Sequence, residues 1–259
     1  MLQNDIHRAL EGGQDILLMT HLVLGYPSFA LNRQVVKQMA AAGVELIELQ
    51  IPFSEPVADG PVIARACQAS IAQGTAVEEC LAFAAEMAGS YPKVHFLLMT
   101  YYNIVFRFGE DAFLERARRA RVRGLIVPDL PIEEGADFFR ATRRVGIDPI
   151  QIFAPTSTSE RMHELEEFAD GFIYCVARRG VTGAATEFDP EFDAYLSRCR
   201  AATDLPLAVG FGIRGREDVD HLLGKADVAV IGSETIRIVD EHGPAAVGPF
   251  LTGLRQANR

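Results

Sequence analysis

The chain has 259 residues, of which 49% are hydrophobic and 23% are charged, and its formal net charge is −10. This composition is close to the globular average and supports a sizeable core without metals or disulfides, so it excludes a disordered chain. The negative charge, with no run of Lys and Arg beyond the short helical piece 116–123, argues against nucleic acid as a partner.

The cysteines are far apart in the sequence, with no C-x-x-C pair and no histidine at ligand spacing; they are Cys67, Cys80, Cys175 and Cys199. This pattern predicts free thiols in a reducing compartment, with no metal site. Residues 1–13 are polar and amphipathic, and no apolar run approaches the roughly 18 residues of a membrane span. We therefore expect a cytoplasmic protein.

Short apolar runs recur along the chain and alternate with segments of helical period. In chain order, strands and helices are predicted at Ile16–Met19, Asn32–Ala42, Leu46–Ile51, Ala76–Ala88, Val94–Met99, Asp111–Ala120, Gly124–Val127, Glu133–Val145, Pro149–Phe153, Ser159–Phe168, Gly171–Val176, Pro190–Ala201, Leu207–Val209, Gly215–Leu223, Val228–Ile231 and Pro244–Leu254.

Eight strand-helix units in this length predict an α/β fold, a single (β/α)8 TIM barrel with extra short helices, as one domain over residues 1–259. A doubly wound open sheet is the alternative. It would normally carry a glycine-rich turn after its first strand, and LGYP at 24–27 is a poor match. In a barrel, the chemistry lies at the carboxyl ends of the strands.

The segment LIELQIPFSEPVADGPV at 46–62 carries two carboxylates near such an end. Glu48 interrupts an apolar strand, and alternation places it opposite Leu49, toward the barrel interior. A buried ionised glutamate costs several kcal/mol unless it is paired, so it is either satisfied by neighbours or kept for proton transfer. Asp59 follows in a proline-rich loop, where it could instead cap a helix beginning at Pro61.

Two glycine turns follow the last two predicted strands: 210–212 (GFG) and 232–233 (GS). Glycine lets backbone N–H groups approach an anion, and a short helix expected at Glu234–Ile238 would direct its positive end to the same place. These turns predict a phosphate site. The long connection 177–185 is either a lid or a surface loop. His21, Tyr101, Tyr102 and Tyr174 are candidates to line an aromatic pocket, or are core and rim residues.

The chain resembles the α subunit of tryptophan synthase over essentially its whole length. The resemblance rests on seven motifs in the same order: LIELQIPFSEPVADGPVI, MTYYNIVF, VPDLP, APTST, RRGVTG, VGFGI and VIGS. It implies retro-aldol cleavage of indole-3-glycerol phosphate to indole and glyceraldehyde 3-phosphate, a step of tryptophan biosynthesis, without cofactor or metal.

On this resemblance Glu48 would shuttle protons, Asp59 would accept the indole N–H, and Thr182 would hold Asp59 when the lid closes. Tyr174, Met99 and Ile63 would sandwich the indole. The phosphate would be held around Gly183, Phe211, Gly212, Gly232 and Ser233. The β subunit would be the partner in an αββα assembly, and pyridoxal phosphate would belong to that partner alone.

Four residues depart from the pattern common in the family, and one of them is Val23, where many members carry threonine. Gln50 stands where glycine is usual, Glu55 where aspartate is usual, and His21 where many members carry an aromatic residue. His21 and Gln50 are expected to reshape the indole pocket, and Glu55 lies in a loop that faces the β subunit in the family. Other functions stay open: a stand-alone indole-releasing lyase, a silent phosphate-binding scaffold, or another phosphosugar enzyme on the same barrel.

Overall fold

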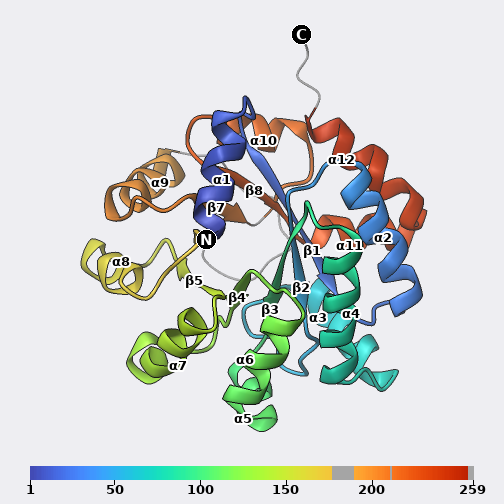
Figure 1. Ribbon diagram of the computed structural model, residues 1–259. Helices are drawn as coiled ribbons and strands as arrows, with labels where there is room; N and C mark the ends of the chain where they lie inside the picture. Colours follow the sequence, from blue (N-terminus) through green and yellow to red (C-terminus); the bar gives the residue numbers. More distant parts are fainter. Residues whose placement is uncertain (177–189, 211, 256–259) are drawn as a thin grey trace.

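The computed structural model describes residues 1–176, 190–210 and 212–255. Within them, eight parallel strands pair in the order β1 to β8 and close into a barrel, as predicted (Figure 1). The strands are β1 (Leu17–Val23), β2 (Leu46–Gln50), β3 (His95–Met99), β4 (Gly124–Ile126), β5 (Asp148–Phe153), β6 (Ile173–Val176), β7 (Leu207–Gly210) and β8 (Val228–Ile231).

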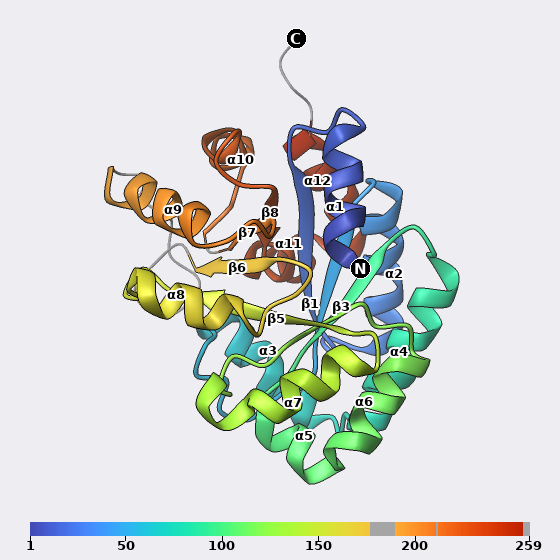
Figure 2. The same cartoon turned by 60° about the vertical axis from the view of Figure 1, so that its left-hand side comes forward.

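Helices surround this barrel in both views (Figures 1 and 2). They are α1 (Leu2–Glu11), α2 (Phe29–Ala41), α3 (Pro61–Ala72), α4 (Val77–Ser90), α5 (Tyr102–Phe108), α6 (Glu110–Arg119), α7 (Ile132–Arg144), α8 (Ser159–Glu166), α9 (Pro190–Ala202), α10 (Arg216–Leu222), α11 (Ser233–His242), the 3-10 turn η1 (Pro244–Ala246) and α12 (Val247–Arg255). Over the described part of the chain, none of these helices has the length and apolar character needed to cross a membrane.

Side chains of each strand alternate between two apolar cores. On β2, Leu46 belongs to the cluster inside the barrel, whereas Ile47 and Leu49 belong to the larger cluster between strands and helices. The same alternation directs Glu48 and Gln50 inward. The four cysteines are free and buried, as predicted.

Helix α1 covers the amino-terminal end of the barrel. Its Leu2 and Ile6 are buried and join the interior cluster, and the Leu2 N–H donates to Asp148 Oδ2 at 2.7 Å. The opposite end, where the strands finish, stays available for a site.

Strand β1 is longer than predicted, since it runs to Val23 and not to Met19. The apolar run is interrupted by Thr20 and His21, but both side chains are buried and have partners. The Thr20 hydroxyl contacts the Met39 sulfur at 3.2 Å, and His21 pairs with Glu48. Strand β1 therefore carries a histidine into the barrel interior.

Candidate active site

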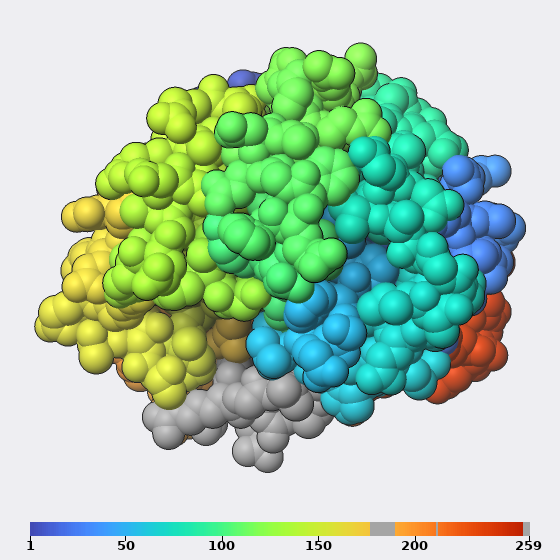
Figure 3. All heavy atoms as spheres, turned by 90° about the horizontal axis from the view of Figure 1, so that it is seen from below, coloured from blue at the N-terminus to red at the C-terminus, as the bar shows by residue number. Residues whose placement is uncertain are grey.

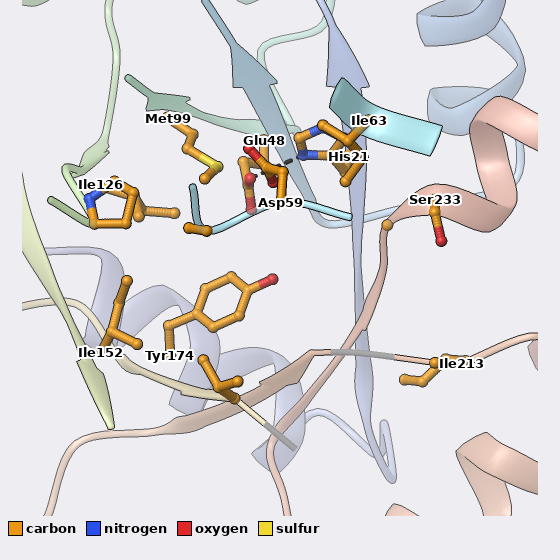
Figure 4. Close-up of a pocket in the computed structure, with 15 residues that line it drawn as sticks. His21, Glu48, Asp59, Ile63, Met99, Ile126, Ile152, Tyr174, Ile213 and Ser233 are labelled. Carbon is orange, nitrogen blue, oxygen red and sulfur yellow. Dashed lines mark hydrogen bonds and ion pairs between the residues drawn. The ribbon is translucent and has the colours of Figure 1, made fainter. Parts of the chain in front are cut away.

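A cavity of about 330 Å³ lies at the carboxyl ends of the strands (Figure 4). Every candidate site residue within the described ranges lines it: Glu48, Asp59, Ile63, Met99, Tyr174, Gly212, Gly232 and Ser233. Thr182, Gly183 and Phe211 lie outside the described residues. Residues that are far apart in the sequence thus line one cavity. The sequence alone did not predict the distances between their side chains.

Glu48 is positioned by strand register. Residues His21 of β1 and Glu48 of β2 are direct partners in the ladder, so their inward side chains are neighbours. His21 Nδ1 and Glu48 Oε1 are 2.9 Å apart, and Glu48 is only 2% exposed. Glu48 Oε2 has no hydrogen-bond partner among the described residues. Neighbouring groups therefore satisfy one carboxylate oxygen and leave the other for a ligand.

Asp59 is held by two donors on the same oxygen. The Gln50 amide Nε2 donates to Oδ2 at 2.7 Å, and the Tyr101 hydroxyl donates to it at 3.0 Å. Helix α3 has Gly60 at its N-cap and no side-chain cap, so the capping role considered for Asp59 is wrong. The carboxylate instead accepts hydrogen bonds from buried donors on β2 and after β3.

The two carboxylates and His21 form one electrostatic group. Burial would lower the pKa of His21, but the charge and hydrogen bond of Glu48, the charge of Asp59 and a contact with Gln50 together raise it above 6.5. Burial also raises the pKa of Asp59 above 3.8, and the charge of Glu48 adds to this, while His21, Gln50 and Tyr101 oppose it.

The rest of the wall is largely apolar, with the Tyr174 ring facing the carboxylates (Figure 4). A Cβ on Gly210 would lie 2.5 Å from the Tyr174 hydroxyl, so glycine at the end of β7 makes room for this ring. Burial, and then the charges of Glu48 and Asp59, raise the pKa of Tyr174 well above 10.0. Its hydroxyl therefore stays protonated.

The other end of the cavity is suited to an anion. Gly212 has a φ of +86°, a conformation that glycine adopts without strain. Helix α11 begins at Ser233 and runs to His242, longer than the expected Glu234–Ile238. Its first turn, at the cavity wall, presents the positive end of the helix dipole.

The aromatic candidates separate into three groups. His21 and Tyr174 line the cavity, and Tyr101 contacts Asp59 from behind. Tyr102 points elsewhere, because its hydroxyl donates to Glu110 at 2.5 Å. Lining residues that were not foreseen are Ala58, Ile126, Pro128, Ile152, Val176 and Ile213. Several of them could have been found as inward positions of the predicted strands.

No group of three or more His, Cys, Asp or Glu side chains in residues 1–176, 190–210 and 212–255 is arranged to hold a metal ion. The chemistry that the described side chains offer is proton transfer between carboxylates and an apolar ligand. The glycine turns offer binding to the ligand's anionic end.

Comparison with known proteins gives one family. A model of the tryptophan synthase alpha chain matches residues 8–247. The tryptophan synthase alpha chain of Desulfotalea psychrophila is 59% identical over 255 residues, 98% of this chain and 100% of the relative. That of Syntrophotalea carbinolica is 51% identical over the same shares of both chains.

Solved structures agree with the sequence relatives. A chain in a structure of Mycobacterium tuberculosis tryptophan synthase superimposes with a TM-score of 0.89 at 30% identity, over 99% of this chain and 98% of that chain. The family match covers most of the sequence, and the fold match covers nearly all of it. The chain therefore belongs to the tryptophan synthase alpha chain family.

Proposed function

We propose that this chain cleaves indole-3-glycerol phosphate to indole and glyceraldehyde 3-phosphate by a retro-aldol reaction. One observation carries the proposal: Glu48 and Asp59 meet in a single apolar cavity whose other end is formed by glycine turns and the start of α11. An indole ring fits between Met99, Ile63 and Tyr174, and the phosphate fits against Gly212, Gly232 and Ser233. Thr182, Gly183 and Phe211, which lie outside the described residues, belong to the same proposal.

The reaction moves two protons and breaks one carbon–carbon bond. Glu48 gives a proton to indole C3, the bond from C3 to the glycerol chain breaks, and the glycerol hydroxyl loses its proton as the aldehyde forms. That second proton returns to Glu48, so the enzyme ends as it began. Asp59 accepts the indole N–H and stabilises the positive charge that develops on the ring.

All of these roles use side chains and backbone groups of the chain itself. We therefore propose that it needs no cofactor, and that pyridoxal phosphate acts only in a β-subunit partner. We further propose that residues 1–259 form one domain. A cytoplasmic location is supported by the four free, buried thiols.

A β subunit is the proposed partner, in an αββα assembly. The loop that carries Asp59 also carries Val57, which is 74% exposed and apolar. This loop lies on the surface beside α5 and α6 (Figure 3), and it stacks Phe53 on Tyr101 at 4.8 Å. A partner that covers Val57 would contact the same short loop that carries Asp59.

The decisive experiment replaces Glu48 by glutamine and measures indole release, with and without the β subunit of a close relative. We expect Glu48→Gln to lower kcat by about 10²–10⁴-fold, because a proton-transfer group is lost. Substrate affinity should stay within about tenfold, because few binding contacts change.

Glu45→Gln is the matched control. Glu45 lies directly before the amino-terminal end of the same strand, where its side chain accepts hydrogen bonds from the Leu18 N–H and the Arg255 guanidinium. It should keep normal turnover. Near-normal turnover of Glu48→Gln would refute the assignment. A wild-type rate that does not rise with the β subunit would indicate a stand-alone lyase, and glycerol phosphate binding without turnover would indicate a scaffold.

A further inference from the structure

Two of the residues that depart from the common family pattern contact the two carboxylates. His21 binds Glu48, and Gln50 binds Asp59. A glycine at position 50 would have no donor to offer, and an aromatic hydrocarbon ring at position 21 could not hydrogen bond to Glu48. The contact with Glu48 has the larger consequence, because histidine itself titrates.

The His21–Glu48 contact is enforced by the fold. The β1–β2 register places the two residues side by side, and their side chains are 4% and 2% exposed. Water therefore has little access to compete for the bond, which spans 2.9 Å. A charge-assisted hydrogen bond in such surroundings is strong and directional.

The groups that face His21 come from two neighbouring elements, with a third across the cavity. Glu48 and Gln50 lie on β2, Asp59 lies in the loop after it, and the Tyr174 hydroxyl on β6 faces both carboxylates (Figure 4). Both acidic groups favour the imidazolium form, and they outweigh the burial that disfavours it. Tyr174 stays neutral. Nδ1 of His21 can thus donate to Glu48 Oε1 both from the cationic ring and from the neutral tautomer that carries its proton on Nδ1.

We propose that His21 is a positioning residue for Glu48, which directs Oε2 to the substrate by binding Oε1 and stabilises the carboxylate that remains after Glu48 has given up its proton. This inference rests on the proposed lyase function. The proton count does not change: the proton on Oε2 goes to indole C3, and the glycerol hydroxyl proton returns to Oε2. The Nδ1 proton of His21 stays in the hydrogen bond throughout.

Kinetics of two variants test the role. His21→Phe removes the donor and restores an aromatic residue, and we expect kcat to fall about ten- to hundredfold with KM changed less than about threefold. His21→Asn places an amide donor near the Nδ1 position and should recover part of the loss. The wild-type kcat should fall as the pH rises through the pKa of His21, and neither variant should show that fall.

His95→Asn is the control, since His95 is a partly buried histidine near α1, away from the site, and contacts Asp5 at 3.8 Å. It should leave the profile unchanged. A His21→Phe profile that superimposes on the wild type would overturn the proposal. Equal losses in His21→Phe and His21→Asn would overturn it too, because the donor would then be irrelevant.

A second readout does not depend on turnover. NMR titration of the imidazole rings should show His21 with a pKa above 6.5, which falls when Glu48 is replaced by glutamine. If the pKa of His21 were the same in wild type and Glu48→Gln, the pairing would be refuted, even if the chain proves inactive. Absence of indole release by the wild type would instead refute the lyase function, so the two failures are distinguishable.

Discussion

Each of the two carboxylates is restrained by donors that come from the barrel itself. Among the described residues, Asp59 accepts hydrogen bonds from the Gln50 amide and the Tyr101 hydroxyl, and Glu48 pairs with His21. Neutral donors such as an amide and a phenol stabilise the ionised form of a carboxyl group without giving it their protons. Such donors suit the role proposed for Asp59. A titratable donor suits Glu48, whose own charge changes in the proposed mechanism.

Replacing Gln50 by methionine keeps the volume and removes the donor to Asp59. The ionised form of Asp59 then loses a charge-assisted hydrogen bond worth about 1.5–3 kcal/mol. The pKa of Asp59, already raised by burial, should rise further. Because Asp59 acts as an anion in the proposed mechanism, the acid limb of the kcat/KM profile should move to higher pH.

The pH dependence of kcat/KM checks this prediction. Gln151→Met is the matched control, because Gln151 is buried on β5 but lies outside the cavity lining. It should leave the acid limb unchanged. An unchanged acid limb in Gln50→Met would show that the 2.7 Å contact with Asp59 does not govern its ionisation.

At the residue scale, the sequence predicted Glu48 and Asp59 as the chemical pair, and both line the cavity. It did not predict that His21 touches Glu48 or that Gln50 touches Asp59. Those contacts depend on the β1–β2 register and on the path of the loop. Neither can be read from one chain, because a shift of one residue would turn every side chain to the other face.

At the element scale, apolar runs located all eight strands, because strands buried on both faces are hydrophobic throughout. The exceptions have physical reasons. β1 seemed to end at Met19 because Thr20 and His21 are polar. Helix α5 was not predicted, because its sequence YNIVFRF is rich in aromatic and β-branched residues, which favour strands. Asp129 accepts the N–H of Tyr102 at the start of α5, a long-range contact that the local sequence does not reveal.

Helix α1 was not predicted, although it closes the amino-terminal end of the barrel. Ile6 is 1% exposed inside the interior cluster. We expect Ile6→Ala to lower the free energy of unfolding by about 2–4 kcal/mol, through lost burial and a cavity. Chemical denaturation would measure this, and kcat should not change because the site lies at the other end. Asn4→Ala, on the exposed side of the same helix, should stay within about 0.5 kcal/mol.

At the scale of the whole molecule, the barrel separates its two tasks. The interior near α1 is apolar and supports folding, whereas toward the other end the inward residues His21, Glu48 and Gln50 are polar, and His21 and Glu48 line the cavity. Buried ionisable groups usually destabilise a fold unless they are paired. The His21–Glu48 pair therefore links the chemistry of the site to the stability of the entire barrel.

This link predicts a pH-dependent stability with a definite sign. The pKa of His21 in the folded chain lies above its unfolded value of about 6.5, so the folded state binds this proton more tightly. The contribution is fully present below the unfolded pKa and is lost as the pH rises through the folded pKa. The difference in thermal unfolding midpoint between wild type and His21→Phe should therefore shrink as the pH rises above about 6.5.

His95 provides a control of opposite sign. Burial, and then Arg123, lower its pKa below 6.5 despite Asp5. Its folded form binds a proton less tightly, so its contribution is present above the unfolded pKa and is lost as the pH falls. The midpoint difference between wild type and His95→Asn should thus grow as the pH rises toward about 6.5. If both differences stayed constant with pH, neither histidine would couple its proton to folding, and the buried pair would be a packing contact alone.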